Sequence, residues 1–258
     1  MRHSFPSWQR KDLVDSMGEY LRKDEATNIC AECNGTGFIL YKNVDGYEYA
    51  KPCQCTLIKE ARERLLKSGL AKEFQAKTFD DFKTCKNPVL EDAKSTVLQY
   101  TDNFFANQDL SGNSLMLCGQ VGAGKTHLGT ACSMRLIDEG IPVIYMGYRE
   151  AITALKANVT DSSIYQKELQ KYKSVQVLFI DDFLKGKITE ADVNIVYEIV
   201  NHRYNNRLPI ILSTEKNLDD LIRFDEAIAS RLIEMCRGHI VVFQGSSLNY
   251  RLYRGGVA

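Results

Sequence analysis

In the 258-residue chain we expect no segment that would direct it to a membrane or out of the cell. No apolar run approaches the ~18 residues of a membrane span, and the start, residues 1–8, has no apolar stretch of the kind found in signal peptides. Neither sign of charge is in excess, because 33 basic residues balance 33 acidic ones. No global field attracts nucleic acid, so any such binding must come from a local patch. We expect a cytoplasmic protein without a membrane partner.

Internal repeats, low-complexity tracts and long linkers are lacking as well. The hydrophobic content of 44% and the charged content of 26% are those of an ordinary soluble protein. The length accommodates one full α/β domain and a small accessory module. In the cytoplasm, the eight cysteines are not expected to form structural disulfides.

A glycine-rich segment indicates the first piece of chemistry. Residues 119–126 fit the pattern G-x-x-x-x-G-K-[ST], between an apolar run at 115–118 and a helix-permissive run at 127–138. Glycines let backbone N–H groups face phosphate oxygens, and a helix N-terminus adds a positive dipole end. Lys125 would reach the β- and γ-phosphates of ATP, and the Thr126 hydroxyl would bind Mg²⁺. The alternative is a glycine-rich turn before a helix. The predicted nucleotide contacts are Gly119, Gln120, Val121, Gly122, Ala123, Gly124, Lys125, Thr126 and His127, with the His127 ring packing or hydrogen-bonding locally.

A second acidic motif completes the predicted nucleotide site. The sequence 177–182, VLFIDD, reads as a strand buried on both faces that ends in two carboxylates. Asp181 would hold Mg²⁺ through water opposite Thr126, and Asp182 would orient or deprotonate the attacking water. The alternative is a strand followed by a helix-capping aspartate pair. One predicted strand, 143–146, lies between the two motifs in the sequence. The strand that carries the acidic motif can therefore be inserted in the sheet away from the strand that precedes it in the chain, as in ring-forming ATPases.

Four cysteines in a short polar segment predict a metal site. Cys30 and Cys33 form a C-x-x-C turn followed by glycines, and Cys53 and Cys55 form a second, C-x-C pair downstream. Tyrosines and Val44 between the pairs indicate a small hairpin that returns the chain. Four thiolates suit tetrahedral Zn²⁺, and so short a segment needs the metal in order to fold. A redox dithiol and unrelated buried thiols are the alternatives. Cys118 and Cys132, in apolar settings, are expected in the core.

Strands and helices alternate from residue 74 to the end, which predicts a parallel sheet with right-handed crossovers. Before them, residues 7–23 predict an amphipathic helix, and the charged run 57–70 predicts an exposed helix that ends at Gly69. The predicted strands are 114–118, 143–146, 175–180, 210–213 and 239–243.

The combination of motifs resembles one group of ATPases. TFDDF at 78–82, GQVGAGKTHL at 119–128, VLFIDD at 177–182, PIILST at 209–214 and SRL at 230–232 occur in order. With these segments, the chain from about Phe74 to Arg254 resembles the DnaC/DnaI-type replicative helicase loaders and the related IstB transposition ATPases, members of the AAA+ superfamily. The implied fold is an α/β AAA+ P-loop core with a five-stranded parallel sheet, preceded by a small zinc-binding module.

The resemblance also implies roles for polar residues outside the two motifs. Ser213 or Thr214 would be the sensor of the γ-phosphate, although Glu215 stands where asparagine is common. Arg231 would be the arginine finger that enters the ATP site of a neighbouring subunit, with Arg237 as the alternative; a surface salt bridge is the competing role of Arg231. Arg251 is a candidate sensor of the second kind. Phe79 and Phe82 would border the adenine or lie in the core.

The second aspartate of the acidic motif predicts slow chemistry. Asp182 stands where many of the resembling ATPases have glutamate, so its carboxylate lies about one bond further from the water. We therefore expect hydrolysis suited to a switch rather than a motor.

A mixed basic and aromatic stretch between the second and third strands predicts contact with single-stranded DNA. Several acidic residues dilute its charge, so an ordinary solvated face is the alternative. Its members are Arg149, Lys156, Lys167, Lys171, Lys173, Tyr148, Tyr165 and Tyr172.

Together these inferences predict an ATP-switched loader of the hexameric replicative helicase onto single-stranded DNA. Residues 1–56 would be the helicase-docking zinc module, 57–74 a helical linker and 75–258 the ATPase domain, which would self-associate through the ATP site. A transposition helper of the IstB kind, which lacks a comparable cysteine cluster, and a nucleotide-gated adaptor with little hydrolysis are the alternatives.

Overall fold

The computed structural model describes residues 30–42, 46–66, 77–107 and 110–252. The chain divides into two compact units, Met1–Lys59 and Glu60–Ala258, which we describe separately. The predicted helix at 7–23 lies outside the described residues, as does the predicted helix end at Gly69.

The first unit contains a two-stranded antiparallel hairpin. Strand β1 (Phe38–Lys42) pairs with β2 (Glu48–Pro52), with Tyr41 opposite Tyr49, so the predicted hairpin is confirmed. Helix α2 (Gln54–Leu66) follows, and it begins three residues before the predicted start. Among the described residues of this unit, only Cys33 and Cys53 are buried.

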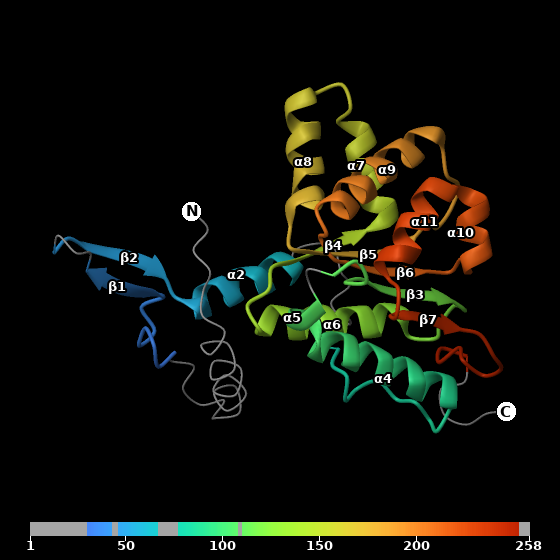
Figure 1. The fold of residues 1–258 in the computed structure, drawn as a ribbon, viewed down its shortest axis with the longest axis horizontal. Coiled ribbons are helices and arrows are strands. Elements are labelled where there is room, and N and C mark those ends of the chain that lie inside the picture. The colour runs from blue at the N-terminus through green and yellow to red at the C-terminus, as the bar shows by residue number, and fades with distance from the viewer. Residues whose placement is uncertain (1–29, 43–45, 67–76, 108–109, 253–258) are drawn as a thin grey trace. The chain divides into compact units, whose positions relative to one another are not determined.

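The second unit is built on a five-stranded sheet whose paired strands are all parallel, which confirms the predicted fold class (Figure 1). Its strands are apolar and largely buried, since helices cover both faces. Each lies within three residues of its predicted bounds: β3 (Leu115–Gly119), β4 (Val143–Gly147), β5 (Val177–Phe183), β6 (Ile210–Thr214) and β7 (Ile240–Phe243).

The strand order is β4-β5-β6-β3-β7. Strand β6 therefore separates the P-loop strand β3 from the acidic strand β5. The expectation that β5 would lie away from its sequence neighbour is wrong, because β5 pairs directly with β4. The inserted strand is β6, which lies between β3 and β5. The polar end of β6 therefore lies between the two motifs.

Helices α4 (Pro88–Asp102) and α6 (Lys125–Asp138) cover one face of the sheet, and α7 (Tyr148–Ala157), α9 (Glu190–Asn205) and α11 (Glu226–Met235) cover the other (Figure 1). Other helices among the described residues of this unit are α5 (Phe104–Asn107), α8 (Ser162–Ser174) and α10 (Leu218–Phe224). The core lies on both faces of the sheet; Phe179, for example, packs against Gly129 of α6. Cys118 and Cys132 are fully buried, as predicted. Within the described part of the chain, no helix combines the length and apolarity of a membrane span.

Candidate nucleotide site and cysteine cluster

The glycine loop delivers the start of α6 to the carboxyl ends of the strands. Gly124 precedes the helix with φ 88°, a left-handed conformation that favours glycine, and no side chain caps the first turn. The N–H groups of that turn are thus free of a side-chain acceptor, as an anion site requires. At Gly119, a Cβ atom would lie 2.5 Å from the Phe243 carbonyl oxygen, so only glycine fits.

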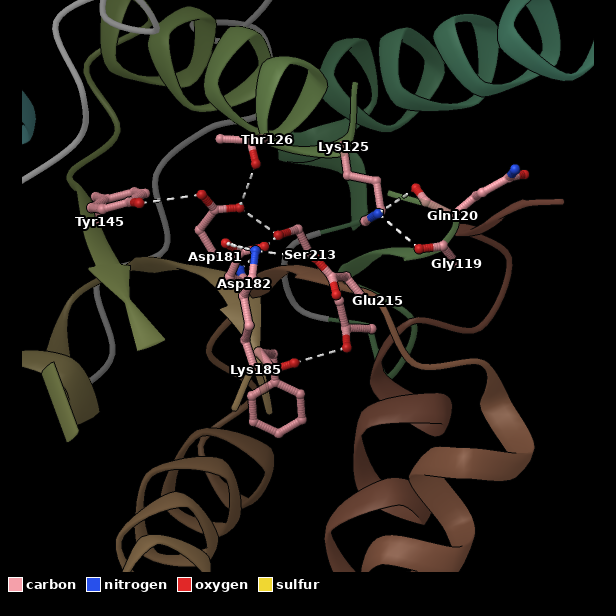
Figure 2. A network of polar contacts seen from close by, with 12 residues as sticks. Gly119, Gln120, Lys125, Thr126, Tyr145, Asp181, Asp182, Lys185, Ser213 and Glu215 are labelled. Carbon is pink, nitrogen blue, oxygen red and sulfur yellow. Dashed lines mark hydrogen bonds and ion pairs between the residues drawn. The ribbon is translucent and has the colours of Figure 1, made fainter. Parts of the chain in front are cut away.

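Lys125 folds back over the loop that precedes it. Its ammonium donates hydrogen bonds to the Gly119 and Gln120 carbonyls at 2.8 and 2.7 Å (Figure 2). Burial lowers the pKa of Lys125, while the carboxylates of Glu215, Asp182 and Asp181 act in the opposite direction. Three carboxylates therefore favour the charged form of Lys125, and phosphate oxygens would replace the two carbonyls.

Asp181 is the centre of a hydroxyl network. The Thr126 hydroxyl donates to one carboxylate oxygen at 3.0 Å, and the Tyr145 hydroxyl donates to the other at 3.2 Å (Figure 2). The Ser213 hydroxyl donates to the oxygen that Thr126 contacts. Burial raises the pKa of Asp181, and these three hydrogen bonds partly offset that effect. Three strands, β4, β5 and β6, and helix α6 therefore converge on one carboxylate.

Asp182 lies beside this network in an unusual backbone conformation. Its φ is 55°, and the pairing of β5 with β6 has a bulge between Ile180 and Phe183. Its N–H donates to the Ser213 hydroxyl at 2.9 Å, and its carboxylate pairs with Lys185 at 2.9 Å. The bulge directs the two consecutive carboxylates into different contacts.

The donor set fits a magnesium nucleotide. Thr126 and Asp181 offer a hydroxyl and a carboxylate oxygen 3.0 Å apart, the hard ligands that Mg²⁺ prefers. The uncapped first turn of α6 and the Lys125 ammonium supply the complementary charge for phosphates.

The four predicted metal-binding cysteines also converge. Their Sγ atoms all lie within 4.8 Å of one another, with Cys30 to Cys53 at 3.7 Å and Cys33 to Cys55 at 3.5 Å. Tetrahedral zinc with ligands at about 2.3 Å places sulfur atoms roughly 3.8 Å apart. The Gly37 N–H donates to Cys33 Sγ at 3.4 Å.

The thiols of the cluster differ in their electrostatics. Burial raises the pKa of Cys33, but the Gly37 N–H and the Cys55 thiol bring it down to about 7. Burial raises the pKa of Cys53 to about 12. A metal ion would hold all four as thiolates, so the geometry fits a cysteine cluster that could bind zinc.

Comparison with known proteins agrees with this arrangement. The family model described as IstB-like ATP binding protein matches residues 57–254. The chain belongs to this family. The phage-like element PBSX protein XkdC from Bacillus subtilis is 34% identical over 253 residues, 95% of this chain and 92% of that protein.

Two solved structures share the AAA+ fold of this IstB-like protein. The DnaC helicase loader has 24% identity and a TM-score of 0.54, covering 67% of this chain and 100% of that one. Replication initiator DnaA, bound to AMPPCP and single-stranded DNA, has 26% identity and a TM-score of 0.52, covering 66% and 50%.

The two sensor candidates take different positions in this IstB-like fold. Ser213 contacts both aspartates of the acidic motif. Thr214 is buried and its hydroxyl donates to the Phe183 carbonyl at 2.8 Å, beside the β5 bulge. Ser213 is therefore the candidate that lies in the site, and Thr214 stabilises the strand ends.

The TFDDF segment packs against the P-loop. The Phe82 ring lies close to Gly124, because a Cβ atom on Gly124 would be 2.5 Å from a carbon of that ring. The Phe82 and His127 rings are in edge contact, with their centroids 5.4 Å apart. His127 Nε2 lies 2.8 Å from the Thr78 carbonyl oxygen, so its ring is engaged locally, as expected. Phe79 and Phe82 are both buried.

The C-terminal segment crosses the same loop. A Cβ at Gly122 would lie 2.1 Å from Asn249 Oδ1, and the Tyr250 N–H donates to the Gly122 carbonyl at 3.0 Å. The sensor candidate Arg251 is exposed next to these residues.

The finger candidate Arg231 is held on the surface of α11. Its guanidinium lies 5.4 and 5.5 Å from the ring centroids of Tyr197 and Tyr204, and Nε donates to Asn201 at 3.1 Å. The competing role in a salt bridge is not observed for Arg231, since its described partners are uncharged. Arg237 is exposed and lies two residues after the end of α11.

The predicted DNA patch is only partly available. Tyr148 and Tyr172 are buried in the apolar core, so the aromatic half of that prediction is wrong for these two residues. The basic members Lys156, Lys171 and Lys173 pair with Asp192, Glu168 and Glu198. Arg149 and Lys167 are exposed.

Sequence reasoning missed Tyr145 and Lys185 as members of the site. Tyr145 belongs to an ordinary apolar strand, and only the pairing of β4 with β5 brings its hydroxyl to Asp181. Lys185 has one sequence signal, its place three residues after Asp182, which suits a turn.

Proposed function

We propose that this chain is an ATP-dependent loader of a hexameric replicative helicase onto single-stranded DNA during the initiation of replication. The observation that carries the proposal is the combination of a nucleotide site with a four-cysteine cluster in a separate unit. The likeness to the DnaC helicase loader supports it at the level of the fold. XkdC, which is 34% identical to this chain, belongs to a phage-like element.

The ATPase residues act on a bound nucleotide in this proposal. The Thr126 hydroxyl would bind Mg²⁺, with Asp181 holding the ion through water; Mg²⁺ would supply charge neutralisation, and Lys125 would turn to the β- and γ-phosphates. Asp182 orients a water whose oxygen attacks the γ-phosphorus; the bond to the β-phosphate oxygen breaks, and the water's proton leaves through Asp182 to solvent. ADP and inorganic phosphate are the products. Ser213 links both aspartates and would report the γ-phosphate.

Arg231 is proposed as the finger for a neighbouring copy. A planar guanidinium that stays ionised suits the spread charge of a transferring phosphoryl group. Tyr197, Tyr204 and Asn201 already hold it in one orientation on the surface, which reduces the entropy lost on engagement. Self-association through the ATP site follows from this role.

The cysteine cluster is proposed as the zinc-stabilised helicase-docking module within residues 1–56. Residues 57–74 would link it to the ATPase domain, 75–258. The hairpin exposes a series of large apolar side chains, as a docking surface would: Phe38, Leu40, Tyr41, Tyr47 and Tyr49.

Two further functions have specific support. The IstB-like family match favours a transposition helper, which would use the same core to act on DNA. A nucleotide-gated adaptor with little hydrolysis is favoured by the ion pair that engages Asp182. The proposed loader would hydrolyse ATP slowly, as a switch does, whereas the adaptor would hydrolyse very little.

The first test is co-elution with the cognate hexameric helicase on gel filtration, with ATP and Mg²⁺. A stable complex that is lost in Cys53→Ser/Cys55→Ser supports a loader with a zinc docking module, and Cys85→Ser, an exposed cysteine outside the cluster, is the matched control. If the complex still forms with the double variant, the helicase-docking surface lies outside the cysteine cluster. No complex with the intact protein contradicts the loader and favours the transposition helper.

A further inference from the structure

The Lys185 ammonium lies between two carboxylates at the ends of strands β5 and β6 (Figure 2). Its Nζ is 2.9 Å from Asp182 Oδ2 and 3.0 Å from Glu215 Oε1. Hydrogen bonding to Asp182 raises the pKa of Lys185, and Glu215 adds to the effect, so the side chain is a cation at neutral pH. One cation therefore serves two anions, and one of them is the carboxylate proposed to act on water.

A tight turn fixes this position. The Lys185 N–H donates to the Asp182 carbonyl at 3.1 Å, which closes a four-residue turn. Asp182 and Leu184 have φ values of 55° and 58°, in the left-handed region that residues other than glycine seldom adopt. The bulge before Phe183 turns Asp182 out of the regular ladder. The short loop itself, rather than a long mobile segment, brings the ammonium to the carboxylate.

The pairs around Lys185 are accessible to water. The side chains of Lys185, Asp182 and Glu215 are 47%, 42% and 34% exposed. Ion pairs with this exposure contribute little stability and are screened, so a change in local charge redistributes them. Asp181 is different, because it is 5% exposed and held by three hydroxyl groups. The two adjacent aspartates therefore differ: one is fixed, and the other can change partner.

We propose that Lys185 is a positioning residue that restrains Asp182, with Glu215 as its alternate partner. The proposal rests on the function proposed above, because Asp182 must act on the attacking water for its release to matter. While Lys185 holds Asp182, the ammonium occupies one of the two carboxylate oxygens that could accept a hydrogen bond from a water. When Lys185 pairs with Glu215 alone, Asp182 is free to orient that water. The three residues form a restraint on hydrolysis.

Single-turnover ATP hydrolysis by the full chain, at saturating ATP and Mg²⁺, tests the restraint. Lys185→Met is expected to raise the rate about two- to fivefold, the equivalent of one exposed ion pair. Glu215→Gln is expected to lower it by a similar factor, because Lys185 then has only Asp182. The double variant should have the rate of Lys185→Met, since Glu215 acts through Lys185.

Two controls separate this role from a general effect of charge. Lys185→Arg keeps a cation in the turn and should restore the slow rate. Lys187→Met removes an exposed lysine two residues further along and should leave the rate unchanged. Affinity for a non-hydrolysable ATP analogue, measured by calorimetry, should change less than the rate in Lys185→Met and in Glu215→Gln.

The kinetic outcomes separate this inference from the proposed function. If Lys185→Met leaves the rate unchanged or lowers it while Asp182→Asn abolishes turnover, the restraint is wrong and the assignment of Asp182 stands. If Asp182→Asn keeps the wild-type rate, the proposed role of Asp182 fails, and the restraint fails with it.

Discussion

The two units of this protein are organised by different forces. In the ATPase unit, apolar strands and helices bury a continuous core that includes Leu117, Phe179 and Ile211. In the cysteine unit, the described residues that are buried are two cysteines, while the aromatic side chains of the hairpin are exposed. The hydrophobic effect therefore accounts for the fold of one unit and not for that of the other.

This difference shows where function can be placed. The ATPase unit fixes its polar site on the ends of buried strands, so the site is as rigid as the core beneath it. The cysteine unit leaves its apolar side chains available for a partner, because sulfur–metal bonds can replace a core.

The largest effect that would test the comparison is loss of the zinc ion that we propose for the cysteine cluster. With Cys53→Ser or a zinc chelator, the first unit should unfold, since structural zinc sites contribute roughly 10–16 kcal/mol of apparent folding free energy. Zinc content and limited proteolysis would measure this, with Cys85→Ser as the control. The ATPase unit should still bind an ATP analogue. An unchanged proteolytic pattern in Cys53→Ser would mean that the unit does not depend on the cluster.

The second effect concerns a buried cation in the ATPase unit. Arg203 is fully buried, and burial lowers its pKa to about 9. It donates hydrogen bonds to the carbonyls of Tyr172, Lys173, Val175, Gln176 and Pro209.

Arg203→Met should reduce the free energy of unfolding by at least about 3 kcal/mol, because several buried carbonyls lose their donor. Urea unfolding would measure it, and Arg223→Met, on an exposed side chain, should stay within about 0.5 kcal/mol. If both variants lost the same free energy of unfolding, the buried hydrogen bonds of Arg203 would not stabilise the core more than an exposed arginine does.

The smallest effect compares one ion pair in each unit. Asp192 accepts from Lys156 at 2.7 Å and caps α9 with Thr189, whereas Lys42 and Glu48 pair on the exposed hairpin. Asp192→Asn should cost about 1 kcal/mol, and Glu48→Gln less than about 0.5 kcal/mol. Calorimetry of the two variants would measure both.

The cost of Asp192→Asn should also depend on pH. Burial alone would raise the pKa of Asp192, but hydrogen bonds from Lys156 and Thr189 lower it below its ordinary value. The stabilisation is therefore present above about pH 4 and is lost as the pH falls through the folded-state pKa. A difference between wild type and Asp192→Asn that persists at pH 2 would contradict the ion pair as its cause.

Much of the ATPase fold could be predicted because its signals are local. Apolar runs such as 177–180 are long enough to identify buried strands, and the glycine loop at 119–126 has a fixed geometry. The spacing of the four cysteines likewise indicated one site, and their sulfur atoms do converge.

The remaining site residues could not be predicted, because pairing between distant strands decides them. Tyr145 reaches Asp181 only because β4 pairs with β5, and the choice of Ser213 over Thr214 depends on which side of β6 faces the aspartates. The buried positions of Tyr148 and Tyr172 also follow from helix packing, which a basic and aromatic composition does not reveal.

The sequence by itself determined the chemistry of this protein: a phosphate-binding loop, two carboxylates after a strand and four thiols. These groups depend on short stretches whose backbone geometry is set by neighbouring residues. Tertiary structure alone decided how the groups are used. The insertion of β6 between β3 and β5 placed Ser213 where it contacts both aspartates. The β5 bulge directed the Asp182 carboxylate to the Lys185 ammonium. Strand order and register come from the packing of the whole core, so no local pattern contains them.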